Sequence, residues 1–331
     1  MPASIRKKTS LVRRAAWTLS LCAFGSSGLA AADRAEYAYV GNQGSGTVSV
    51  IDTARDEVVR TLPSQGKIGA KVQAVVADRS NKTAFVVDAL GDSLVTVDVA
   101  SGEVGTRIAV GRGPEGASLA PTGHSIAVCI EDDNDVAFVD PARATVTRKI
   151  ALVGKNPEHC AFSADGRWLM TSNENSDDVD IVDVRAGRSL GVVHTSGHPR
   201  GIAWLPKRQI AYVAQESSGG VDVVDVAARK VIGSIHTGLR PSGAIASRDG
   251  KLVFVTNGGD GTVSAVETDG GKVVATIPVG KRPWNMAITH DGRKLYVANG
   301  RSNSVSVIDV PALRVLKEIA VGELPWGVSI P

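Results

Sequence analysis

The chain is poor in the residues and motifs on which sequence-encoded active sites usually rely. It has three cysteines and six histidines in 331 residues, and no Cys-x-x-Cys-His segment that would attach a c-type haem. It also lacks the Gly-x-Ser-x-Gly turn of serine hydrolases, the His-Glu-x-x-His pattern of zinc proteases and a phosphate-cradling glycine loop. The sequence therefore predicts no catalytic residue, no metal site and no cofactor.

Helical periodicity is absent as well. No repeat contains a 10-residue stretch with apolar residues at i, i+3, i+4 and i+7, and β-branched residues dominate the apolar runs. After residue 32 there is no membrane span. Only Cys129 and Cys160 remain there, and the sequence leaves open whether they pair or are two separate buried thiols.

Residues 1–32 have the composition of an export signal. Basic residues without any acid precede an apolar run from about residue 15 to 29, and three alanines follow. The run is shorter than the ~20 residues that span a bilayer, which disfavours a membrane anchor. A twin-arginine signal at Arg13 and Arg14 is a further, less favoured alternative. We predict a cleaved signal peptide at 1–32, a mature domain at 33–331 and a periplasmic location.

The positive charge of the chain belongs to that leader. Five of the 37 basic residues lie in it, which leaves 32 basic against 34 acidic residues in the mature part. A near-neutral protein lacks the excess of positive charge with which proteins bind nucleic acid or anionic membranes. We therefore expect a monomer whose partner is a periplasmic protein or a small ligand.

What the sequence does have is a repeat of about 42 residues. Seven alternating strands end in an acid, with steps of 46, 42, 43, 42, 42 and 42 residues, at Asp52, Asp98, Asp140, Asp183, Asp225, Glu267 and Asp309. A fixed period in this range marks a stacked or radial array. Because these acids recur in all seven repeats, we expect them to cap turns.

Residues 281–322 show one repeat unit in full. Strands are predicted at 283–289, 294–299, 305–309 and 314–321, with an Asp-Gly turn at Asp291 between the first two. The chain starts on a second strand at 36–42 and ends on a first strand at 325–330. Pairing these two would close a ring, which an open β-solenoid would lack. We predict an all-β, seven-bladed propeller of four-stranded antiparallel blades, closed by the C-terminal strand.

The second strands carry a family resemblance. Tyr39-Val-Gly-Asn42, Tyr212-Val-Ala-Gln215, Phe254-Val-Thr-Asn257 and Tyr296-Val-Ala-Asn299 resemble the Tyr-Val-Thr-Asn tetrapeptide of the YVTN family of β-propeller repeats. The resemblance covers about residues 36–330, and the segment from Gly300 to Val328 looks most like the branch associated with pyrroloquinoline-quinone-dependent catabolism. It implies a seven-bladed, often exported propeller with no shared catalytic residues.

Positions that differ between repeats are the candidates for function. The residue after each Gly-x-x-Pro proline should line the channel mouth, with Lys71 standing for the proline in the second repeat; these residues are Val72, Glu115, Glu158, Arg200, Ser242, Trp284 and Trp326. With neighbouring His159, Arg240 and Arg282, we expect Trp284 and Trp326 to stack a ligand that Arg200, Glu115 and Glu158 orient. The alternative is that the tryptophans plug the channel and the charges face water.

Three functions fit these residues. The preferred one is a non-catalytic exported propeller that binds a partner or small ligand on this face, and the family resemblance implies an accessory role in quinone-dependent oxidation. The second is an enzyme of the lactonase or lyase type at the channel mouth, and the third is a ring-stacking quinone- or nucleic-acid-binding module. The acidic loop Glu131–Asp135 lacks EF-hand spacing, so we expect it to be solvated.

Overall fold

The structure, a computed structural model, describes residues 35–331 together with Met1 and Ala3. The predicted signal peptide lies almost wholly outside the described residues. Residues 35–331 form one compact unit. Within the described residues, we find no helix with the length and apolar character of a membrane span.

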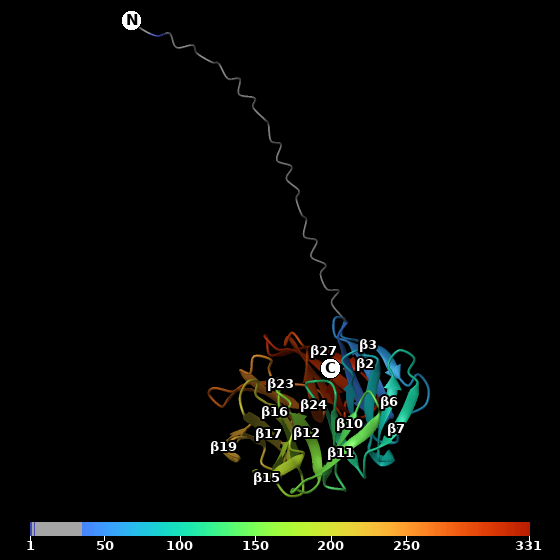
Figure 1. Ribbon diagram of the computed structural model, residues 1–331. Helices are drawn as coiled ribbons and strands as arrows, with labels where there is room; N and C mark the ends of the chain where they lie inside the picture. Colours follow the sequence, from blue (N-terminus) through green and yellow to red (C-terminus); the bar gives the residue numbers. More distant parts are fainter. Residues whose placement is uncertain (2, 4–34) are drawn as a thin grey trace. The chain divides into compact units, whose positions relative to one another are not determined.

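The described residues form seven four-stranded sheets around a central channel (Figure 1). From the channel outwards, the first blade contains β28 (Pro325–Ser329), β1 (Tyr37–Asn42), β2 (Thr47–Asp52) and β3 (Glu57–Leu62). The second contains β4 (Val72–Ala77), β5 (Thr83–Asp88), β6 (Ser93–Asp98) and β7 (Val104–Ala109), with a 3-10 turn at Ala89–Gly91. The third contains β8 (Pro114–Leu119), β9 (Ile126–Ile130), β10 (Asp135–Asp140) and β11 (Thr145–Ala151).

The other four blades repeat this order. The fourth contains β12 (Pro157–Phe162), β13 (Trp168–Asn173), β14 (Asp178–Asp183) and β15 (Arg188–His194). The fifth contains β16 (Pro199–Trp204), β17 (Ile210–Gln215), β18 (Gly220–Asp225) and β19 (Lys230–His236). The sixth contains β20 (Pro241–Ala246), β21 (Leu252–Asn257), β22 (Thr262–Glu267) and β23 (Lys272–Pro278). The seventh contains β24 (Pro283–Ile288), β25 (Lys294–Asn299), β26 (Ser304–Asp309) and β27 (Arg314–Ala320).

The ring closes as predicted. β28 pairs antiparallel with β1, with Val40 opposite Val328 and Gly41 opposite Gly327. Each sheet is thus complete, and the first blade is assembled from both ends of the described chain. The prediction of seven antiparallel blades is confirmed.

The core lies between neighbouring blades rather than inside any one of them. Second and third strands are buried on both faces, and the aromatic ring near the start of the second strand fills the space between blades in most repeats, as Tyr39, Phe85, Phe254 and Tyr296 do. The outermost strands alternate between exposed and half-buried residues. Packing between blades fixes where each inner strand sits, and therefore which side chains reach the channel.

The recurring acids at the ends of the third strands have the structural role predicted for them. The carboxylate of Asp52 accepts hydrogen bonds from the backbone of Ala54 and Arg55, and Asp98 does the same for Ser101. Equivalent bonds form at Asp140, Asp183, Asp225 and Asp309. Cys129 and Cys160 are buried free thiols in the interface of the third and fourth blades.

Candidate functional site

The side chains at the upper mouth of the channel come from the points where the inner strands begin. In six blades a proline pairs with the last residue of the second strand, as Pro199 does with Gln215. In the second blade Val72 takes this place, opposite Asp88. The prediction for the second blade was therefore wrong by one residue. Val72, and not Lys71, corresponds to the proline, and Gln73, and not Val72, is the residue that follows it into the channel.

A second set of side chains is brought to the same place by a backbone hydrogen bond. The residue after each second strand donates its N–H to the carbonyl of the residue before the proline, as Glu216 does to His198. The residues after the second strands are Gln43, Ala89, Glu131, Glu174, Glu216, Gly258 and Gly300. Those before the proline position are Lys71, Gly113, Asn156, His198, Arg240, Arg282 and Leu324. We call the region formed by these two rings and the first channel residues the upper mouth.

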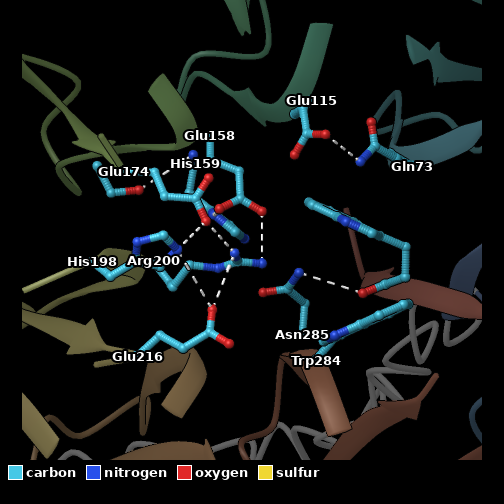
Figure 2. Close-up of polar contacts among 12 residues, drawn as sticks. Gln73, Glu115, Glu158, His159, Glu174, His198, Arg200, Glu216, Trp284 and Asn285 are labelled. Carbon is cyan, nitrogen blue, oxygen red and sulfur yellow. Dashed lines mark hydrogen bonds and ion pairs between the residues drawn. The ribbon is translucent and has the colours of Figure 1, made fainter. Parts of the chain in front are cut away.

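Arg200 is the centre of the upper mouth (Figure 2). Its guanidinium contacts Glu158 at 2.7 Å, Glu174 at 2.7 Å and Glu216 at 3.2 Å. Only 13% of its side chain is exposed. Burial alone would lower the pKa of Arg200, but the surrounding carboxylates, Glu158 first, raise it. The arginine is therefore a fixed cation that orders three glutamates from the fourth and fifth blades.

Glu216 is shared by several cations. Besides Arg200, it accepts from Arg240 at 2.6 Å and from Arg282 at 3.0 Å. Burial opposes its ionisation, but the arginines outweigh burial and lower its pKa. The imidazole of His198 contacts Glu174 through Nε2 and lies 4.0 Å from Glu216. A histidine held by a carboxylate beside an arginine can accept and pass on a proton.

The opposite side of the upper mouth is acidic. Glu115 accepts from Lys71 at 3.1 Å and from Gln73 at 2.8 Å. Burial raises the pKa of Glu158 well above its ordinary value, and the charges of Glu115 and Glu174 add to this. Burial, with the charges of Glu115 and Glu174, also raises the pKa of Glu131 to about 7. Burial also opposes the ionisation of Glu115, but Lys71 and Gln73 outweigh it and lower the pKa of this carboxyl, so the raised pKa values on this side are those of Glu131 and Glu158.

The two predicted tryptophans have different surroundings. Trp284 is half-buried and lies on the backbone of Gly300, where an added Cβ would come within 2.7 Å of the ring. Trp326 is 8% exposed and stacks on His159, with ring centroids 5.3 Å apart and planes at 15°. Burial, with the charge of Arg200, lowers the pKa of His159 to about 3, so this imidazole is neutral. Asn285 donates to the carbonyl of Trp326 at 3.4 Å.

The predicted site residues therefore separate into two groups. Glu158, Arg200, Arg240 and Arg282 join one ion-pair network, and Glu115 lies beside it. His159 and Trp326 form a stacked layer, and His159 directly follows Glu158 of that network in the sequence. Sequence reasoning left Glu174, His198 and Glu216 out of the site. They could have been found by comparing the repeats at two positions, the residue before the proline and the residue after the second strand, because the residue type at both positions varies from blade to blade.

One group of side chains has the spacing of a metal site. Possible ligand atoms of Glu174, His198 and Glu216 all lie within 4.8 Å of one another. The guanidinium of Arg200 contacts both carboxylates, so the position that a cation would take is already filled.

The acidic loop Glu131–Asp135, which we expected to be solvated, forms ion pairs with neighbouring basic residues. Its Asp133 pairs with Arg112 at 2.8 Å and lies 3.9 Å from Lys149.

Two family models match adjoining parts of the chain. Residues 69–195 match the YNCE-like β-propeller, and residues 188–321 match the lactonase type of seven-bladed β-propeller. Each match covers less than half of the chain. A search of curated proteins found no match.

Solved structures of other propellers have the same fold. Hydrazine synthase of Kuenenia stuttgartiensis is 22% identical, with a TM-score of 0.68 over 76% of this chain and 87% of that one. A functionally unknown protein from Desulfotomaculum acetoxidans DSM 771 is 14% identical, with a TM-score of 0.76 over 89% and 98%. A proposed 6-phosphogluconolactonase from Bacteroides uniformis ATCC 8492 is 18% identical, with a TM-score of 0.72 over 90% and 100%.

These identities are low enough that the three structures support the fold alone. The family models add that the lactonase-type match contains His198, Arg200, Glu216 and the two further arginines of the network. The described part of this chain is therefore a seven-bladed β-propeller that is similar over one segment to YNCE-like propellers and over the next to lactonase-type propellers.

Proposed function

We propose that the upper mouth binds a small anionic ligand, with one carboxylate seated among Arg200, Arg240 and Arg282. The observation that carries the proposal is the sharing of Glu216 by these three arginines. Glu158 and Glu174 also contact Arg200, but within the described residues no carboxylate other than Glu216 binds Arg240 or Arg282. Arg240 and Arg282 depend on this one shared carboxylate, and the buried Nη1 of Arg282 has no hydrogen-bond partner in the part of the chain that the structure describes, which suits one more anion.

The neighbouring blades provide space for such a ligand. Gly258 and Gly300 stand where the third to fifth blades carry glutamates, so no further carboxylate is present on that side, and the side chain of Arg240 is 61% exposed. Trp284 lies on Gly300 and offers a flat apolar surface beside the arginines. A few convergent polar groups next to an aromatic surface are typical of small-molecule sites.

The test is binding of a panel of mono- and dicarboxylates and sugar acids, measured by thermal shift and calorimetry. Arg240→Gln and Arg282→Gln should each weaken the best ligand about tenfold, since a charged hydrogen bond contributes ~1.5–3 kcal/mol. Arg208→Gln is the matched control, because Arg208 forms an exposed pair with Asp269 away from the mouth. Failure of every anion to bind, or unchanged affinity in both variants, would contradict the proposal.

Lactone hydrolysis is a second candidate, favoured by His198, which lies inside the segment matched by the lactonase-type model and contacts Glu174. In this scheme His198 accepts a proton as water adds to the lactone carbonyl, and Arg200 stabilises the developing oxyanion. The ring C–O bond then breaks, and the proton passes to the departing alkoxide, which gives the hydroxy acid.

Hydrolysis of aldonolactones and muconolactone-like substrates, followed by pH-stat titration, tests this candidate. His198→Ala should lower turnover by about 10²–10⁴, the usual contribution of a general base. The same variant should keep most of its affinity for the product anion, since the arginines remain. A rate no higher than that of buffer across the panel excludes this candidate and leaves anion binding untouched.

Export and an accessory role in quinone-dependent oxidation remain proposals that rest on residues 1–32 and on the repeat resemblance. The carboxylate could then belong to a periplasmic partner protein instead of a free metabolite. Cell fractionation tests the location, and growth of a deletion strain on alcohols that require a quinoprotein dehydrogenase tests the role. Cytoplasmic protein or undiminished growth would contradict the respective proposal.

A further inference from the structure

The lower half of the channel is a second compartment, distinct from the upper mouth. It is a cavity of about 500 Å³ lined by the later residues of the inner strands, such as Val76, Ala117, Ile202, Ala244 and Met286. We call it the lower cavity. Ligand pockets commonly have about 300–1,000 Å³, so this volume suffices for a small molecule.

The inner end of the lower cavity is the layer formed by His159, Asn285 and Trp326. Both ring nitrogens of His159 are buried and make no hydrogen bond of normal geometry within the described residues. A buried polar group without a partner is costly, so a ligand that supplies a hydrogen bond here would be stabilised. The inner end therefore offers an aromatic wall with one neutral polar group.

The outer end of the cavity is basic. Seven residues beyond the proline position, the repeats carry Arg79, Pro121, Ala164, Pro206, Arg248 and His290, and three of these are basic. Arg79 and Arg248 both line the cavity, together with His290 and Pro331. This position varies from blade to blade, as the channel residues of the upper mouth do.

The two arginines are bound only to backbone carbonyls among the described residues. Arg79 donates to Pro121, and Arg248 donates to Thr289 at 3.0 Å and Ile288 at 2.8 Å. The nearest acids have other partners, since Glu36 binds His290 and Asp291 caps its own turn. Neither guanidinium has an ion-pair partner within residues 35–331, so both are available to an anion.

We propose that the lower cavity binds an elongated amphipathic carboxylate, with its carboxylate at either Arg79 or Arg248, which lie three blades apart round the ring, and its apolar chain extending inward to Trp326. The five residues between the level of His159 and that of Arg248 span roughly 16 Å at ~3.3 Å per residue. A medium-chain fatty acid matches this depth, and a hydroxyl at its inner end would meet the unpaired imidazole. This site is separate from the proposed anion site of the upper mouth and does not depend on it.

Decanoate, ω-hydroxydecanoate and ω-bromodecanoate are the probes. Calorimetry should show saturable binding of decanoate to the protein, and ω-hydroxydecanoate should bind more tightly. The bromine of ω-bromodecanoate should quench tryptophan fluorescence by contact. Trp326→Phe should keep the affinity but lose most of the quenching, which would place the chain end in the lower cavity.

Two kinds of variant test the assignment independently. The double variant Arg79→Gln with Arg248→Gln should weaken decanoate binding at least about tenfold, because it removes whichever charged hydrogen bond holds the carboxylate. Ala244→Leu should block the cavity, and circular dichroism checks that it folds. Arg208→Gln, a basic residue of the same face outside the cavity, should bind decanoate as the unchanged protein does.

Three results would overturn the proposal. One is the absence of saturable binding below millimolar decanoate. Another is full affinity in both the double arginine variant and folded Ala244→Leu. The third is loss of decanoate binding in Arg240→Gln alone, since this would assign the fatty acid to the upper mouth.

Discussion

The upper mouth and the lower cavity are lined by the same seven strands, yet one is filled with charges and the other is open and mostly apolar. In the upper mouth, each blade contributes up to three variable positions, and their long side chains meet in ion pairs around Arg200. In the lower cavity the strands carry short or aliphatic residues, and basic groups appear only at the outer end. One repeat can thus build two compartments because its positions vary independently at the two ends of the inner strand.

The largest expected effect comes from removing the layer between the compartments. Trp326→Ala should lower the free energy of unfolding by about 3–5 kcal/mol, because it removes a buried ring and leaves a cavity. Urea denaturation measures this. Trp326→Phe keeps most of the layer and should cost under about 1.5 kcal/mol. Equal losses in the two variants would mean that the ring does not separate the compartments.

The next prediction tests the charged half alone. Glu216→Ala leaves Arg282 and Arg240 without their shared carboxylate, and breaking a buried pair costs about 3 kcal/mol or more of unfolding free energy. Glu57→Ala removes an exposed partner of Lys317 and should cost less than about 1 kcal/mol. If denaturation experiments show equally small losses of unfolding free energy in both variants, the ion pairs of Glu216 do not stabilise the network around Arg200.

A smaller effect should appear in the pH dependence of stability. The pKa of Glu131 is raised to about 7 in the folded protein, above its ordinary value of 4.5. Between these values the folded state holds a proton that the unfolded state has lost, so stability falls as pH rises through this window. Glu131→Gln should lose less stability than the unchanged protein between pH 5 and 7.5. If the free energy of unfolding falls equally steeply with pH in the two proteins, the carboxyl of Glu131 ionises as an ordinary glutamate does.

The smallest effect is expected at the outer end of the lower cavity. Arg79 and Arg248 are exposed and bind only carbonyls, so Arg79→Gln should change the free energy of unfolding by no more than about 0.5 kcal/mol. Thermal denaturation without ligand measures this. A larger loss would assign these arginines a structural role, comparable to that of Arg200 in the upper mouth.

The fold could be predicted in detail because its signals are local and repeated seven times. The period, the Asp-Gly turns and the offset between the two ends of the sequence determine the strand order and the closing pair. The site could be predicted only in part. Arg200 and Glu158 follow from the proline position. Glu174 reaches Arg200 from the neighbouring blade and Glu216 from the end of the next strand, and these proximities are set by the pairing of strands and blades and not by sequence spacing.

The one-residue error at Val72 has a similar cause. The second repeat lacks the proline that marks the start of the inner strand elsewhere, so only the pairing of Val72 with Asp88 reveals the register. The stack of His159 on Trp326 was also beyond prediction, because the two residues lie on blades that do not adjoin.

The strand that completes the first blade also carries Trp326, and this has a consequence for the timing of function. β28 follows all the other described strands in the sequence, so nearly the whole described chain separates it from its partner β1. Closing so long a loop is entropically costly, so the ring forms late. Until β28 docks, the wall between the compartments is missing and neither ligand site is complete. A chain in which β28 has not yet paired with β1 would therefore be unable to form either proposed ligand site.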